Sequence, residues 1–221
     1  MSYKVIGDKN VFAFEYTLEN KTQNEKYNYW GTIRLWVLGI NVCKYQSENQ
    51  VFEHEGYLNH TIEWLCENLE YIVGYDDYPL PVEGNDMNDI FEKVYKFEAD
   101  ELEEELWFGA NSRWIFRHTW LNTRDGSILP SVCFRRLGNV IEVSWDNEFY
   151  RKYNIYYLSE KASFQINRME FIKVIIMFLK SIISDFRKQD KNLVDWIENL
   201  QKKLKFYEIV EEGAENQGLS F

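Results

Sequence analysis

The sequence predicts an α+β fold, and three observations support this prediction. Residues 10–19 and 27–46 are rich in aromatic and β-branched residues with alternating polarity, which is typical of strands. Apolar residues then recur at helical spacing over 58–74 and 86–120. A strand pattern returns at 131–146. This order of strands, helices and strands excludes a regular alternation of single strands and helices.

The strand segments are expected to form one small antiparallel sheet from residues 3–46 and 131–166. In the first part, "YNYWGTIRLWVLGINVCKYQ" (27–46) predicts two strands joined by a tight turn near Gly39. In the second part, residues 137–139 mark the turn of a hairpin.

Helices are expected to cover this sheet. The helix at 58–74 is followed by a loop in which Pro79 and Pro81 force extended backbone. The segment 86–120 is mostly helical, and Gly109 is expected to break it into two helices.

The last part of the chain predicts a pair of helices. Asn167 and Glu170 resemble a capping box, which marks a helix start. Residues 169–187 are apolar nearly all round, which predicts a buried helix, and residues 192–209 are amphipathic.

Composition indicates a compact globular protein. The 221 residues include 17% aromatics and only three prolines, and this length allows a sizeable core without disulfides or metal. We expect an α+β domain at 1–166, a C-terminal helical subdomain at 167–209 and a flexible tail at 210–221.

Cellular location is predicted from cysteines and hydropathy. Three widely separated cysteines argue against a disulfide framework and favour a reducing compartment. No signal-peptide pattern opens the chain, and its longest apolar run, 171–186, contains Lys173, Lys180 and Asp185. We therefore expect a cytoplasmic protein with no membrane partner.

Charge is unevenly distributed along the chain. The net charge of −11 argues against direct binding of nucleic acid. Residues 83–105 hold ten acidic residues and two lysines, whereas residues 111–137 hold five arginines and one aspartate. The acidic run predicts either a solvated helix face or a docking surface for a basic partner. Its candidate docking residues are Glu98, Asp100, Glu101, Glu103, Glu104 and Glu105.

No cofactor or metal site is predicted. The segment "HEGYLNH" is similar to a zinc-binding HExxH helix, but its histidines, His54 and His60, are six residues apart and would point in different directions on a helix. The sequence also lacks the glycine-rich nucleotide motifs and the G-x-S-x-G nucleophile motif.

One polar cluster precedes the hairpin, in "RHTWLNTRDG" (117–126). Its arginines could clamp a carboxylate or phosphate, or His118 could act as a base oriented by Asp125. The structural alternative is that Arg124 and Asp125 stabilise the loop and that His118 is a buried residue with satisfied hydrogen bonds. The candidate ligand- or partner-binding residues are Arg117, His118, Asn122, Arg124, Asp125, Arg135 and Arg136.

Three segments together resemble a known family. They are a W-G-x-[IL]-x-[IL]-W-V-x-G strand pair, a tryptophan-containing helix followed by "YPLP", and R-H-x-[LW]-x-x-[AT]-R-x-G-x-x-L-P before the hairpin. Across residues 27–146 this layout resembles the amino-terminal region of some large bacterial proteins of the ImmA/IrrE class. Those proteins carry a zinc peptidase domain after it, and the peptidase signature is absent here.

The resemblance implies a sensing or partner-binding module tied to bacterial stress responses, mobile elements or phage defence. No catalytic residue is carried over, and the arginines and His118 would line a recognition surface. We expect a non-enzymatic bacterial or phage protein that acts in phage defence, stress response or its inhibition by binding a protein partner. Two alternatives stay open: an acidic nucleic-acid mimic of the anti-restriction or anti-CRISPR type, and a small-molecule sensor or hydrolase that uses His118, Arg124 and Asp125.

Overall fold

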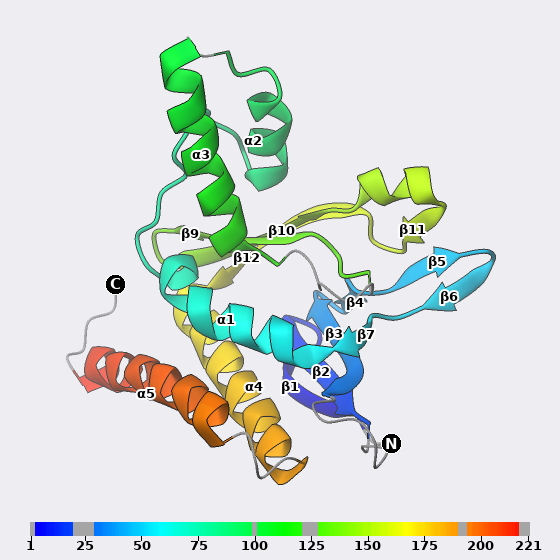
Figure 1. Ribbon diagram of the computed structural model, residues 1–221, viewed down its shortest axis with the longest axis vertical. Helices are drawn as coiled ribbons and strands as arrows, with labels where there is room; N and C mark the ends of the chain where they lie inside the picture. Colours follow the sequence, from blue (N-terminus) through cyan, green and yellow to red (C-terminus); the bar gives the residue numbers. More distant parts are fainter. Residues whose placement is uncertain (1–2, 20–28, 99–100, 121–127, 190–193, 217–221) are drawn as a thin grey trace.

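A computed structural model describes residues 3–19, 29–98, 101–120, 128–189 and 194–216. In this part of the chain, antiparallel sheets pack against helices, which confirms the α+β prediction. One lobe, formed by α2 (Met87–Val94) and α3 (Glu101–His118), projects from the body of the molecule (Figure 1).

The first sheet is built around β2 and β3. Its strands are β1 (Lys4–Asp8), β2 (Phe12–Leu18), β3 (Trp30–Val37), β4 (Ile40–Asn41) and β7 (Glu55–Tyr57). β2 pairs with β1 and β3, while β4 and β7 share the other edge of β3. Gly39 adopts a φ of 80° in the turn between β3 and β4, as its place in the predicted tight turn requires. Gly31 is required by close packing, because a Cβ there would lie 2.0 Å from the Thr17 carbonyl oxygen.

The second sheet has the order β12-β10-β9-β8. Its strands are β8 (Thr119–Trp120), β9 (Val132–Leu137), β10 (Val140–Asp146) and β12 (Lys161–Asn167). β9 and β10 form the predicted hairpin with its turn at Gly138 and Asn139. Both faces of β9 are buried: Val132 and Phe134 lie in the main core, and Cys133 lies in a smaller core under the projecting lobe.

A third sheet forms an arm that extends from the body (Figure 1). It contains β5 (Tyr45–Ser47), β6 (Gln50–Phe52) and β11 (Ile155–Tyr157), and the 3-10 helix η1 (Glu148–Tyr153) precedes β11. The prediction of one sheet from residues 3–46 and 131–166 is therefore wrong. Among the described strands, the pair β5 and β11 joins the first part of the chain to the second, in a sheet separate from those built around β3 and β10.

Three helices complete the main core. They are α1 (Leu58–Val73), α4 (Arg168–Gln189) and α5 (Val194–Asn216). Asn167 accepts hydrogen bonds from the backbone of Met169 and Glu170, as the predicted helix start requires. α4 packs on β2, where the rings of Phe14 and Phe178 stack with centroids 4.3 Å apart.

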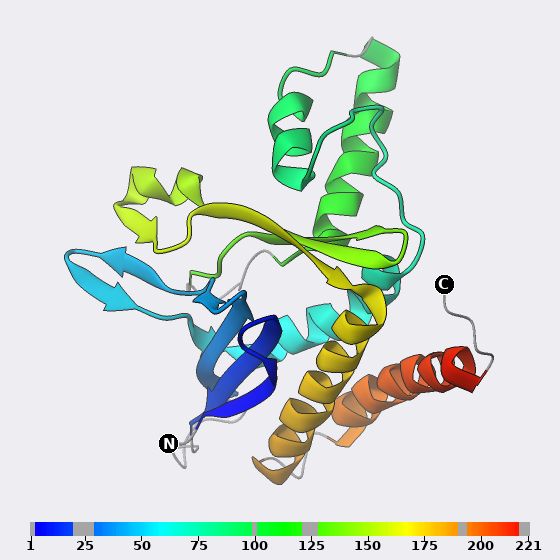
Figure 2. The same ribbon diagram turned by 180° about the vertical axis from the view of Figure 1, so that it is seen from behind.

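The C-terminal helices pack against the rest of the fold. α4 shares the main core with the sheets, and α5 lies beside α4 (Figure 2). α5 also continues to Asn216, into the segment expected to be a flexible tail, and residues 217–221 lie outside the described part. Among the described helices, none combines the length and apolar character needed to cross a bilayer.

The projecting lobe contains α2 (Met87–Val94) and α3 (Glu101–His118). α3 runs through Gly109 without the expected break. A glycine inside a helix costs about 1 kcal/mol, and packing of Trp107 against Phe97 and of Trp114 in the lobe core offsets this cost. The small core of the lobe also contains Met87, and it rests on the second sheet.

Candidate functional site

His118 ends α3 in a buried position. Its Nδ1 lies 2.8 Å from the Phe134 carbonyl oxygen, and its Nε2 lies 3.0 Å from the Asp76 carboxylate. The ring stacks on Trp114 with centroids 4.0 Å apart. Burial lowers the pKa of His118, while the hydrogen bonds to Phe134 and Asp76 act in the opposite direction. Both ring nitrogens are therefore engaged within the protein.

Arg117 joins the same carboxylate. Its Nη2 lies 2.9 Å from Asp76 Oδ2, and its guanidinium lies over the ring of Tyr71 at 4.5 Å. Asp76 follows α1, so Arg117 and His118 together attach the end of α3 to the segment that leaves α1. These contacts are those of a structural anchor.

Arg135 points to a different carboxylate, Glu142. This side chain is 1% exposed and accepts hydrogen bonds from Arg135 Nη2 at 2.6 Å and the Met87 amide at 2.7 Å. The Ser144 hydroxyl donates to it as well. Because Met87 begins α2, this network, which we call the Glu142 node, ties the lobe to the second sheet.

Arg136 closes the end of α1. It donates to the Val73 carbonyl oxygen at 3.3 Å, and its guanidinium lies 3.7 Å from the centroid of Tyr75. Arg168 donates to the same carbonyl at 2.8 Å. Burial, followed by the neighbouring Arg136, lowers the pKa of Arg168. Helix C-termini are suited to cations in this way.

The other predicted site residues divide into two groups. Asn122, Arg124, Asp125 and Asp100, and the side chain of Glu101, lie outside the described residues. The side chains of Glu98, Glu103, Glu104 and Glu105 are exposed near or on the first turns of α3. The structure thus does not gather the described arginines into one open surface.

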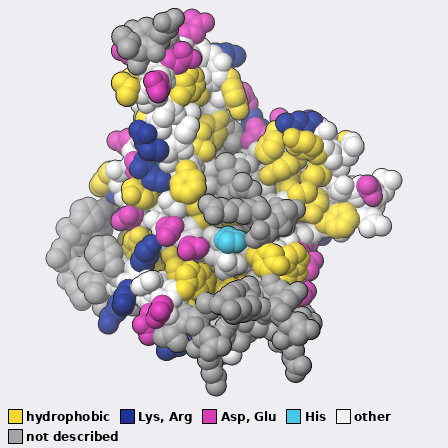
Figure 3. Space-filling view, in the orientation of Figure 1, with side chains coloured by type: hydrophobic (Ala, Val, Ile, Leu, Met, Phe, Trp, Pro, Cys, Tyr) yellow, Lys and Arg dark blue, Asp and Glu magenta, His cyan; other side chains and the backbone are white. Residues whose placement is uncertain are grey.

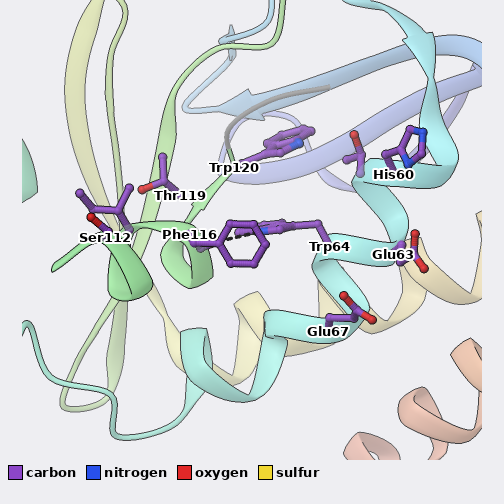
Figure 4. Close-up of a pocket in the computed structure, with 10 residues that line it drawn as sticks. His60, Glu63, Trp64, Glu67, Ser112, Phe116, Thr119 and Trp120 are labelled. Atoms are coloured by element: carbon purple, nitrogen blue, oxygen red, sulfur yellow. Dashed lines mark hydrogen bonds between the residues drawn. The ribbon is translucent and has the colours of Figure 1, made fainter. Parts of the chain in front are cut away.

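A cavity of about 660 Å³ lies between α1 and α3, and the sequence did not predict it. Its aromatic walls are Trp64, Phe116 and Trp120, and Figure 4 shows Trp120 facing His60 across it. Trp64 Nε1 donates to the Phe116 carbonyl oxygen at 2.8 Å, which fixes one wall. We call this space the α1–α3 cavity.

A sequence signal for this cavity does exist. Residues 60, 64 and 67 on α1, and 112, 116 and 119 at α3, recur at spacings of three and four, beside the apolar stripes that build the core. Each stripe contains an aromatic residue among polar ones. Neither stripe shows by itself that the two helices face each other, so the cavity follows only from the placement of α1 against α3.

A second cavity, of about 610 Å³, lies on the other side of α3. Residues of α2, β9, β10 and η1 line it, including Phe91 and Phe149, together with Tyr95, which follows α2. Ile115 and Thr119 line both cavities. We call this space the lobe–arm cleft.

The two histidines of "HEGYLNH" lie in different environments. His54 is buried, and its Nδ1 contacts the Ile128 carbonyl oxygen at 3.0 Å. Burial lowers the pKa of His54 to about 4. His60 lines the α1–α3 cavity. Within the described ranges, no three histidine, cysteine, aspartate or glutamate side chains gather as a metal site would require.

Comparison with known proteins found no relative. No family model, no curated protein and no solved structure matches the chain. The resemblance to the ImmA/IrrE class therefore stays a prediction.

Proposed function

We propose that this is a protein-binding protein whose docking surface is the tip of the projecting lobe. The observation that carries the proposal is the exposure of large apolar side chains there. Tyr95 is 91% exposed, Leu106 is 75% exposed and Phe108 is 41% exposed. Several large exposed apolar side chains on one projecting element mark it as a candidate interaction site.

Acidic side chains lie next to the exposed apolar ones on the lobe. Glu104 and Glu105 are exposed beside Leu106, and Figure 3 shows acidic and hydrophobic side chains next to one another on the lobe. An apolar centre with acidic neighbours suits a partner with a basic rim around an apolar patch. Such charge complementarity accelerates association and makes it depend on salt.

The resemblance implies that the arginines line a recognition surface, and this stays a prediction. Arg117 and Arg135 are paired with Asp76 and Glu142, so they support the lobe from below. The alternative of a sensor or hydrolase depends on Arg124 and Asp125, outside the described residues, and the nucleic-acid mimic depends on rows of carboxylates. Both alternatives, and the role in defence, stay predictions.

The test compares two double charge reversals. The lobe variant is Glu104→Lys with Glu105→Lys, and the control is Glu170→Lys with Glu198→Lys, exposed acids on α4 and α5 that change the net charge equally. Proteins that co-purify with the tagged chain from its source cells are identified, purified and titrated against all three chains at low and high salt.

The proposal predicts that the lobe variant binds roughly tenfold more weakly or worse at low salt, and that the control does not. Leu106→Ala with Phe108→Ala should weaken binding at both salt concentrations, because apolar contacts are not screened. Equal affinity of the wild-type and lobe-variant chains for every purified partner would contradict the proposal.

A further inference from the structure

We propose that the α1–α3 cavity binds a small uncharged ligand with a planar ring and a hydrogen-bond acceptor, such as a nucleoside or an aromatic amide. This inference does not rest on the docking surface. It starts from the size of the cavity, about 660 Å³, which is within the range of ligand sites.

Two buried polar atoms in the cavity wall point to a ligand. Thr61 Oγ1 and Trp120 Nε1 have no hydrogen-bond partner in the described structure. Their side chains are 3% and 1% exposed, respectively. Buried polar groups are nearly always paired, and an unpaired one requires an explanation. Both residues line the cavity, so an acceptor that reaches either donor from the cavity would satisfy it.

The walls favour a flat ring. Trp64, Phe116 and Trp120 surround the space with aromatic surface, and the indole N–H of Trp64 is already used by the Phe116 carbonyl. Stacking between planar rings and aromatic side chains is favourable and tolerant of ring identity. The unpaired donors then select rings that carry an acceptor.

The rim disfavours an anion. Glu63 accepts from Trp196 Nε1 at 3.3 Å, and Glu67 lies 3.3 Å from Lys203 Nζ, so these carboxylates are held at the side that faces α5. The described lining contains these two acids and no lysine or arginine. A phosphate or carboxylate would meet like charge there, whereas a neutral ring would not.

The experiment follows the indole N–H resonances of the eight tryptophans by NMR. The probes are uridine, nicotinamide, uridine monophosphate and toluene, and Trp120→Phe assigns the resonance of Trp120. Ligands of this size have roughly millimolar dissociation constants, so titration to about 10 mM covers the range.

Uridine or nicotinamide should shift the Trp120 resonance downfield, as a new hydrogen bond requires, and toluene should not. Tighter binding of uridine would identify the ligand class as a nucleoside, and tighter binding of nicotinamide would identify it as an aromatic amide. Uridine monophosphate should bind at least threefold more weakly than uridine. Tighter binding of the monophosphate, or no shift with either neutral probe, would overturn the proposal.

Two variants connect the binding to the unpaired donors. Thr61→Val keeps the side-chain shape and removes the hydroxyl, and Trp120→Phe removes the indole donor. Each should weaken binding roughly three- to tenfold, the usual effect of one hydrogen bond. The control is Trp30→Phe, since Trp30 donates to Glu55 outside the cavity.

Because Thr61 Oγ1 is unpaired, Thr61→Val should also leave the melting temperature unchanged or raise it. Unaltered affinity in both cavity variants refutes the assignment.

Discussion

The Glu142 node makes the sharpest stability prediction. Glu142→Ala removes the acceptor for Met87, Ser144 and Arg135, and it leaves the Arg135 side chain, 12% exposed, without its counter-charge. Removing one partner of a buried ion pair costs about 3–5 kcal/mol. Glu142→Gln keeps one oxygen acceptor, so its cost should be smaller, about 2 kcal/mol.

The measurement is urea denaturation followed by tryptophan fluorescence, with the free energy of unfolding taken at constant m-value. The matched control is Glu160→Ala, which breaks a pair with Arg151, a side chain that is 50% exposed. Exposed pairs contribute at most about 1 kcal/mol. The reasoning is refuted if Glu142→Ala destabilises the protein no more than Glu160→Ala does.

The position of the Glu142 node also predicts which part of the protein opens first. Since Glu142 holds the first amide of α2, Glu142→Ala should loosen the lobe before the rest of the fold. Hydrogen exchange should therefore accelerate at Ile90 and Trp114 more than at Ile33 in the first sheet. Uniform acceleration at all three residues would show that the lobe and the body open as one unit.

Three further predictions concern single residues. The pKa of His54 is about 4 in the folded chain, against 6.5 in the unfolded chain. Acidification from pH 6.5 to 4 should therefore remove about 3 kcal/mol from the free energy of unfolding. In urea titrations at several pH values, His54→Asn should reduce this dependence of stability on pH. Phe178→Ala should cost about 3–5 kcal/mol in the same assay, because its ring stacks on Phe14 in the main core. Asp86→Ala should lower the free energy of unfolding by about 1 kcal/mol, because the Asp86 carboxylate accepts from the Asp89 amide at 2.9 Å at the start of α2. An unchanged urea midpoint would exclude a capping role.

Local patterns predicted many elements of the fold. The tight turn at Gly39, the hairpin turn at Gly138 and the helix start at Asn167 depend on residues close in sequence, so single positions were sufficient. The division into three sheets was not predictable in this way. It depends on which strand occupies each edge of β3 and β10, and these pairings join residues far apart in the chain.

The candidate site was harder to predict than the fold. Segregation of charge along the chain predicts a ligand- or partner-binding role for Arg117 and Arg135. In the structure their partners are Asp76 and Glu142, acids outside the acidic run 83–105. Burial at His118 agrees with the structural alternative considered from the sequence. The α1–α3 cavity escaped prediction because it needs the relative placement of two helices, which neither helix encodes alone.

The last turn of α3 and the first residue of β8 separate two hollow spaces. Ile115 and Thr119 form part of both the α1–α3 cavity and the lobe–arm cleft, so a displacement of this turn that widens one space narrows the other. Occupants of the two spaces would therefore influence each other through a shared partition. Thermodynamic linkage makes this influence mutual: the factor by which one occupant changes the affinity for the second equals the factor by which the second changes the affinity for the first.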